Sequence, residues 1–269
     1  MAEIKNLKEM SKRMRLNSID MAYNAGALGA HLGGGLSCIE IFAALFGRTA
    51  KLVGDHSEID RIIVGKAHCV LAYYSALVEV GSLKIDDLKQ FEKNGSQLAG
   101  HPKRNIDIGI DFSGGSLGMA APVAVGMAIS IKKHNRNNKV FLVLGDGECE
   151  EGTIWESLMI ASHYKLNNLV IIVDNNKLQS DGPVSLVAGI DDYREKFEAF
   201  GCSVVSVDGH NADEIADKLD ISMEDKPLCV IADTVKGKGV SFMENDPGWH
   251  HGVLTEDMYV KAKLEIMNG

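Results

Sequence analysis

Two apolar runs in the middle of the chain constrain its fold more than any other feature. Residues 139–144 (KVFLVL) and 168–173 (NLVIIV) are almost entirely apolar. A strand buried on both faces reads as a continuous run of this kind, whereas a half-solvated strand alternates. A helical stretch at 152–164 lies between the two runs. The runs therefore predict parallel strands joined by a crossover helix.

Similar segments recur along the chain, so the sheet extends beyond two strands. Strands that alternate with helices predict an α/β fold, with a doubly wound, mostly parallel sheet covered by helices on both faces. We expect a single domain, 1–269, because no repeat or linker interrupts the sequence. Further strands are expected at 61–64, 203–207 and 228–235, helices at 37–46, 70–80 and 213–219, and a helical stripe at Ile4, Leu7, Met10, Met14 and Ile19.

Composition excludes several classes of protein. The net charge of −9 argues against nucleic-acid binding, which needs basic clusters to neutralise phosphates. No apolar run has the length of about 18 residues that a membrane helix needs, and the charged N-terminal segment lacks a signal-peptide core. The five cysteines are odd in number and form no CxxC pair. Reduced thiols and a cytoplasmic location are therefore expected.

Polar side chains follow each of the two apolar runs. Asp146 stands between two glycines directly after the first run, and Asn176 follows the second. Ligands of parallel sheets bind beyond the carboxyl ends of the strands. If the strands are neighbours, these oxygens could hold Mg²⁺, whose remaining ligands a diphosphate would supply. Either motif alone is more typical of an ordinary turn, and only their joint placement favours a site.

The motifs GDGECEEG (145–152) and VDNNKLQSDG (173–182) resemble the thiamine-diphosphate motif, in which Gly-Asp-Gly, a helix and a paired Asn follow one another. The resemblance is closest to transketolases and covers nearly the whole chain. The usual Gly-His-Pro of that family reads Ala30-His31-Leu32 here, so this turn could differ. The supporting motifs occur in transketolase order: AHLGGGLS (30–37), GKAH (65–68), AGHP (99–102), GSLG (115–118) and KGKGVSFMENDPGWHHG (236–252).

This resemblance implies thiamine diphosphate and Mg²⁺, or Ca²⁺ or Mn²⁺, as cofactors. The metal ligands would be Asp146, the Asn176 side chain and the Leu178 carbonyl oxygen. Leu178 and Leu117 could equally be core residues, and Glu151 a solvated carboxylate. The other implied cofactor contacts are the backbones of Gly115 and Gly147, Leu117 at the aminopyrimidine, Asp174 near the thiazolium, Glu151 at the subunit contact beside the aminopyrimidine end, and His68 and His251 at the diphosphate.

Four histidines stand where transketolases place theirs. Ketol transfer moves protons at sugar hydroxyls near neutral pH, where imidazole titrates. By the resemblance, His101 contacts the terminal hydroxyl of the donor sugar. His68 and His251 flank the diphosphate, and His31 and His251 reach the reacting hydroxyls. His250 remains an alternative to His251 because the two are adjacent.

The resemblance is confined to the diphosphate-binding half of a transketolase. The other half provides the glutamate at the aminopyrimidine and most sugar-phosphate contacts, and its pattern is missing from this sequence. We therefore expect this chain to be the N-terminal component of a two-subunit transketolase that acts on sugar phosphates. A separate C-terminal subunit carrying the pyrimidine-binding and C-terminal domains would complete an α2β2 complex.

Two other interpretations remain open at this point. The chain could be the α-subunit of another thiamine-dependent enzyme, such as a 2-oxo-acid dehydrogenase, which shares Gly-Asp-Gly and the paired Asn but lacks these histidine motifs. It could also be a catalytically silent cofactor-binding regulatory protein. Lys236 and Lys238 are likewise ambiguous, because a glycine–lysine segment suits either phosphate binding or a solvated loop.

Overall fold

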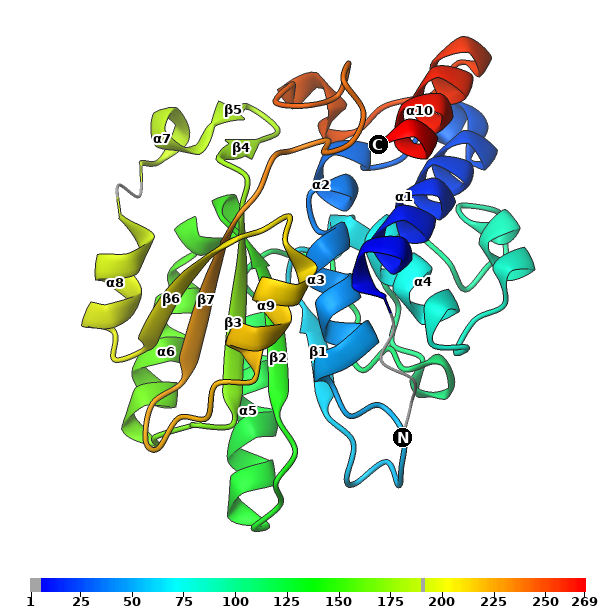
Figure 1. The fold of residues 1–269 in the computed structure, drawn as a ribbon. Coiled ribbons are helices and arrows are strands. Elements are labelled where there is room, and N and C mark those ends of the chain that lie inside the picture. The colour runs from blue at the N-terminus through cyan, green and yellow to red at the C-terminus, as the bar shows by residue number, and fades with distance from the viewer. Residues whose placement is uncertain (1–5, 190–191) are drawn as a thin grey trace.

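The computed structural model describes residues 6–189 and 192–269. Its main sheet has five strands in the order β1-β2-β3-β7-β6, and every neighbouring pair is parallel (Figure 1). The predicted α/β fold with a parallel sheet is confirmed. All five expected strands are present, although the last ends two residues early. Their bounds are Arg61–Val64 (β1), Val140–Gly145 (β2), Leu169–Asn175 (β3), Ser203–Asp208 (β6) and Leu228–Asp233 (β7).

Each central strand contributes alternate side chains to two separate cores. Leu142 and Leu144 of β2 pack into one core, and Phe141 and Val143 pack into the other. Both faces are buried because helices cover both, which explains why the strands read as continuous apolar runs. The first core contains side chains of α5 (Ala120–Lys133), α6 (Gly152–His163) and α8 (Tyr193–Ala199). The opposite core contains α1 (Leu7–Asn24), α2 (Leu32–Leu36), α3 (Ile39–Ala44), α4 (Val70–Glu79), α9 (Ala212–Leu219) and α10 (Glu256–Asn268).

The N-terminal helix α1 buries the predicted stripe. Leu7, Met10, Met14 and Ile19 are all buried, and Asn6 caps the helix by accepting from the Glu9 amide at 3.2 Å. Ile4, the first member of the stripe, lies outside the described residues.

The predicted helix at 37–46 is wrong in its bounds. Helix formation begins earlier, at Leu32, and stops at Leu36 before α3 starts at Ile39. The break coincides with Ser37, whose hydroxyl lies 3.1 Å from the Gly34 carbonyl oxygen and donates to Asp174 Oδ2, far away in sequence, at 2.7 Å. A π-helical turn then spans Leu45–Thr49.

Helices α5, α8 and α10 were not predicted. Helix α5 is rich in alanine and other apolar residues, so it offers little contrast between faces. Helix α10 is mostly exposed and touches the core through Ala262 and Ile266. Helix α8 is short and buries only Phe197. A small hairpin, β4 (Leu178–Gln179) with β5 (Gly182–Pro183), and the short α7 (Val184–Val187) also follow β3.

Among the described helices, none combines the length and apolar character that a membrane crossing requires. The carboxyl ends of β1, β2, β3 and β7 lie along one edge of the sheet because the strands are parallel. The segments that follow them carry most of the predicted site residues, and His31 stands at the start of α2, before β1.

Candidate active site

A cavity of about 240 Å³ lies at the carboxyl edge of the sheet. Larger surface grooves lie along α10, between α1 and the start of α9, and between α5 and α6, and none of the predicted site residues lines them. The predicted residues that line the cavity are His31, His68, His101, Gly115, Leu117, Asp146, Gly147, Asn176 and Leu178.

Asp146 and Asn176 enter this cavity from adjacent strands. Gly145 of β2 pairs with Asp174 of β3, so the residues beyond these strand ends are neighbours. Both side chains are buried, and the Asp146 carboxylate accepts from the amides of Gly147, at 2.8 Å, and Lys177. Burial, followed by the charge of Asp174, raises the pKa of Asp146 to about 6. The arrangement presents a carboxylate and an amide to one small space.

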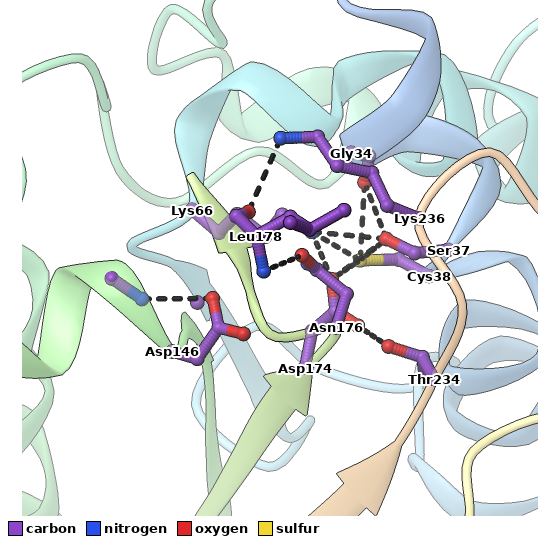
Figure 2. A network of polar contacts seen from close by, with 12 residues as sticks. Gly34, Ser37, Cys38, Lys66, Asp146, Asp174, Asn176, Leu178, Thr234 and Lys236 are labelled. Carbon is purple, nitrogen blue, oxygen red and sulfur yellow. Dashed lines mark hydrogen bonds and ion pairs between the residues drawn. The ribbon is translucent and has the colours of Figure 1, made fainter. Parts of the chain in front are cut away.

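Beneath the cavity, Asp174 is the centre of a buried polar network (Figure 2). Its Oδ2 atom accepts from the Lys66 ammonium group, from Ser37 Oγ at 2.7 Å and from Asn176 Nδ2 at 3.0 Å, and its Oδ1 accepts from Thr234. Burial alone would raise the pKa of Asp174, but Lys66 reverses this and the pKa is lowered. Because Asn176 donates through its nitrogen, its oxygen is left as an acceptor, which Leu178 N uses at 3.1 Å.

Lys236 lines the cavity, so it is not the solvated loop residue considered as one alternative. Its side chain is almost fully buried, and its ammonium group donates to the carbonyl oxygens of Leu178 and Gln179, both at 3.1 Å. Burial, followed by the charge of Lys66, lowers the pKa of Lys236 to about 8. Lys238, in contrast, is partly exposed and pairs with Glu244 at 3.5 Å.

The histidines form one cluster. The His31 ring centroid lies 5.6 Å from His68, 5.4 Å from His101, 5.5 Å from His250 and 4.7 Å from His251. Burial is the largest cause that lowers the pKa of His31 to about 3, and it lowers the pKa of His68 well below its usual value. Neutral imidazoles of this kind can both accept and donate a hydrogen bond.

The two adjacent histidines of the C-terminal motif have different surroundings. His250 lines the cavity, and its Nδ1 atom lies 3.2 Å from the Lys236 ammonium nitrogen. Its pKa is lowered to about 4, by burial first and by Lys236 second. His251 is exposed and packs against His31, outside the cavity lining.

Two predicted cofactor residues other than His251 lie beyond the cavity lining. Asp174 is fully buried behind it, and Glu151 is exposed at the start of α6. Leu117, which does line the cavity, is 39% exposed, so it is not the core residue considered as an alternative. The sequence analysis assigned no role to Lys66, Ser37, Thr234, Glu148 or Gln179. Four of them stand inside motifs that the sequence analysis quoted, and this position could have identified them as site residues: Lys66 in GKAH, Ser37 in AHLGGGLS, Glu148 in GDGECEEG and Gln179 in VDNNKLQSDG.

The cavity fits a diphosphate and one divalent cation. Two glycines on its wall have little room for a side chain: a Cβ on Gly34 would lie 2.8 Å from the His68 ring, and one on Gly147 would lie 3.0 Å from Gln179 Oε1. The candidate metal ligands are one carboxylate, one amide and one carbonyl. Within residues 6–189 and 192–269, no group of three or more His, Cys, Asp or Glu side chains is placed to hold a metal ion. A donor set this small suits Mg²⁺ that shares a phosphorylated ligand.

Known proteins are similar to this chain over most of its length. Residues 7–266 match the family described as transketolase, thiamine diphosphate binding domain. One subunit of the apulose-4-phosphate transketolase of Phocaeicola vulgatus is 35% identical over 98% of this chain and 95% of its own length. The 6-deoxy-6-sulfo-D-fructose transketolase subunit SqwG of a Clostridium species is 37% identical over 90% of both chains.

Full-length transketolases match over part of their length. The transketolase structure from Campylobacter jejuni superimposes with a TM-score of 0.88 at 28% identity, covering 97% of this chain but 42% of that one. Human transketolase is 34% identical over 98% of this chain and 42% of its own length. The chain therefore belongs to the transketolase family, in which it corresponds to the thiamine diphosphate binding domain.

Proposed function

We propose that this chain is the thiamine diphosphate- and Mg²⁺-binding component of a two-subunit transketolase. The complex would transfer a two-carbon ketol unit from a ketose phosphate to an aldose. The observation that carries the proposal is the convergence of Asp146 and Asn176 on one cavity from adjacent parallel strands. Two relatives of nearly the same length are named as transketolase subunits, which supports the divided architecture.

The metal ion would bind the Asp146 carboxylate, the Asn176 side-chain oxygen and the Leu178 carbonyl oxygen. Mg²⁺ suits these hard oxygen donors, and Ca²⁺ or Mn²⁺ could take its place. The Leu178 carbonyl already accepts from a cation, the Lys236 ammonium group at 3.1 Å. Lys236 and His68 would face the diphosphate, and the backbone of Gly147 would lie against it.

Thiamine diphosphate would supply the electron sink that ketol transfer needs. Asp174 would lie near its thiazolium ring as a carboxylate that Lys66 keeps ionised. Gly115 and Leu117 are exposed on the cavity wall, where they would contact the aminopyrimidine end.

The histidines would bind and orient the sugar. His101 is exposed on the cavity wall and would contact the terminal hydroxyl of the donor. His31 and the neighbouring His251 would reach the reacting hydroxyls, where neutral imidazoles can pass protons between oxygens. His250, whose Nδ1 atom lies 3.2 Å from the Lys236 ammonium nitrogen, would face the diphosphate, which is the alternative to His251 that the sequence left open.

A partner subunit would complete the site. We propose that the chain acts as a single domain, 1–269, in a cytoplasmic α2β2 complex with the C-terminal subunit. Glu151 would stand at the subunit contact, which agrees with its exposure at the start of α6. The 42% coverage of full-length transketolases is what a chain carrying one part of that enzyme would give.

The test is an assay of the complex obtained by co-expressing this chain with the product of its neighbouring reading frame. Ketol transfer from a ketose phosphate, dependent on thiamine diphosphate and Mg²⁺, is the expected result. Oxidative decarboxylation of a 2-oxo acid without ketol transfer would favour the 2-oxo-acid dehydrogenase alternative. Tight cofactor binding with neither reaction would favour a regulatory protein.

A further inference from the structure

We propose that Glu148 and Thr153 are positioning residues that clamp Gly118 and so hold the segment 115–118 in place for the cofactor. The proposal rests on the proposed function, because it concerns how one wall of the thiamine diphosphate site is fixed. Both side chains belong to the stretch that directly follows Asp146. The clamp would therefore tie the aminopyrimidine wall to the metal loop.

The two side chains take both polar groups of the Gly118 backbone. Gly118 N donates to Glu148 Oε1 at 2.9 Å, and the Gly118 carbonyl accepts from Thr153 Oγ1 at 3.1 Å. Gly118 precedes Met119, the N-cap residue of α5, so its carbonyl takes no part in the hydrogen bonds of that helix. Thr153 supplies the missing donor to this buried group.

Gly118 also lies so close to Thr153 that a residue with a side chain would not fit at this position. Its φ of +81° lies in the left-handed region, where glycine is favoured. A Cβ added there would collide with Thr153 Oγ1 and lie 2.9 Å from Glu151 Cβ. The backbone at this point is thus fixed by contact as well as by hydrogen bonds.

The Glu148 carboxylate reaches further segments of the site. It is 2% exposed, and its second oxygen, Oε2, accepts from Gly145 N at 3.3 Å. On another side it lies so close to Gly65 that a Cβ there would be 2.8 Å from Oε2. Gly65, Gly118 and Gly145 belong to the segments that carry His68, Leu117 and Asp146, respectively. One buried carboxylate therefore sets the spacing between three walls of the cavity.

The segment that the clamp holds is otherwise open. Gly115 has no atom within 4 Å of its Cβ position, and Leu117 is 39% exposed. At its other end, Gly114 N donates to the Pro102 carbonyl at 3.0 Å. Release of Gly118 would leave the Leu117 side chain free to move relative to the metal loop, while Asp146 keeps its own contacts with Gly147 and Lys177.

The test compares two ligands in the complete two-subunit complex by calorimetry. Thiamine diphosphate with Mg²⁺ reports on the whole site, and inorganic pyrophosphate with Mg²⁺ reports on the metal loop alone. Thr153→Val removes the hydroxyl and keeps the shape, and Thr153→Ser is the matched control because it keeps the hydroxyl. Glu148→Gln keeps the size but offers a single acceptor oxygen.

We expect Thr153→Val and Glu148→Gln to weaken thiamine diphosphate binding about tenfold, since each leaves a buried backbone group unpaired. For Thr153→Val, pyrophosphate affinity should stay within about twofold of wild type, and Thr153→Ser should match wild type for both ligands. Glu148→Gln should also lose some pyrophosphate affinity, because its carboxylate accepts from Gly145 N beside Asp146. Equal losses of both ligands for Thr153→Val, or no loss of either, would overturn the clamp. If Glu148→Gln does not fold, the Thr153 pair decides alone. A wild-type complex that binds neither ligand would contradict the proposed function instead.

Discussion

The ammonium group of Lys66 donates to Oδ2 of Asp174, and neither side chain exposes more than 2% of its surface. The contact raises the pKa of Lys66 despite burial and lowers that of Asp174 despite burial. The pair therefore stays charged. Because Asn176 also donates to Asp174 Oδ2, the pair fixes how the predicted metal ligand presents its oxygen.

Removal of one partner of this pair should destabilise the protein strongly. Lys66→Met leaves a buried, uncompensated carboxylate, and we expect the free energy of unfolding to fall by about 3–5 kcal/mol. Lys66→Met combined with Asp174→Leu should recover part of this loss, because no buried charge remains. Denaturant unfolding of both variants checks the prediction. A single variant as stable as wild type would show that the ion pair is not formed.

The histidine cluster should make stability depend on pH. The pKa values of His31, His68 and His250 are all lowered on folding, to about 3 for His31 and about 4 for His250. Between about pH 6.5 and 4 these three histidines bind more protons in the unfolded chain than in the folded one, so their contribution lowers stability as pH falls through this window. The pKa values of Asp146 and Glu148, raised mainly by burial to about 6 and about 7, oppose part of this loss. Urea unfolding should give a lower free energy of unfolding at pH 5 than at pH 7.5. His68→Asn should reduce the pH dependence, and the exposed His163→Asn should leave it unchanged.

His101→Ala should separate sugar binding from cofactor binding. His101 lies on the cavity wall at its exposed side, with its ring 5.4 Å from His31. We expect kcat/KM for the ketose phosphate to fall about tenfold or more, as for the loss of one hydrogen bond. The affinity for thiamine diphosphate should not change. Steady-state kinetics of the complex provide the measurement, with His134→Ala, an exposed residue after α5, as the control. Unchanged kinetics would remove His101 from the donor site.

The sheet could be predicted from sequence because each central strand is a local signal. An apolar run can be recognised as a strand without knowing which strands lie beside it, and all five strands were predicted within two residues of their observed ends. The bounds of α2 and α3 were missed because the break at Ser37 depends on Asp174, far away in sequence. Helix α5 was missed because it has no strong polar face to give a period.

Site residues could be predicted from the sequence where a motif contains them. They could not be predicted where the burial of their side chains depends on residues far away in the sequence. Asp146 and Asn176 follow their strands directly, so their placement was readable. The burial of Lys236 depends on carbonyl oxygens at residues 178 and 179, which no local pattern reports. For the adjacent His250 and His251, only the backbone geometry decides which one lines the cavity.

The central claim is that Asp146 and Asn176 together hold the metal ion that binds the diphosphate. Calorimetric titration of thiamine diphosphate into the complex, with Mg²⁺ and with EDTA, tests it most directly. We predict tight binding for wild type only with Mg²⁺, and loss of at least about a hundredfold in affinity for Asp146→Ala. The exposed Asp220→Ala should bind as wild type does. An Asp146→Ala complex that retains Mg²⁺-dependent binding at wild-type affinity would contradict the account.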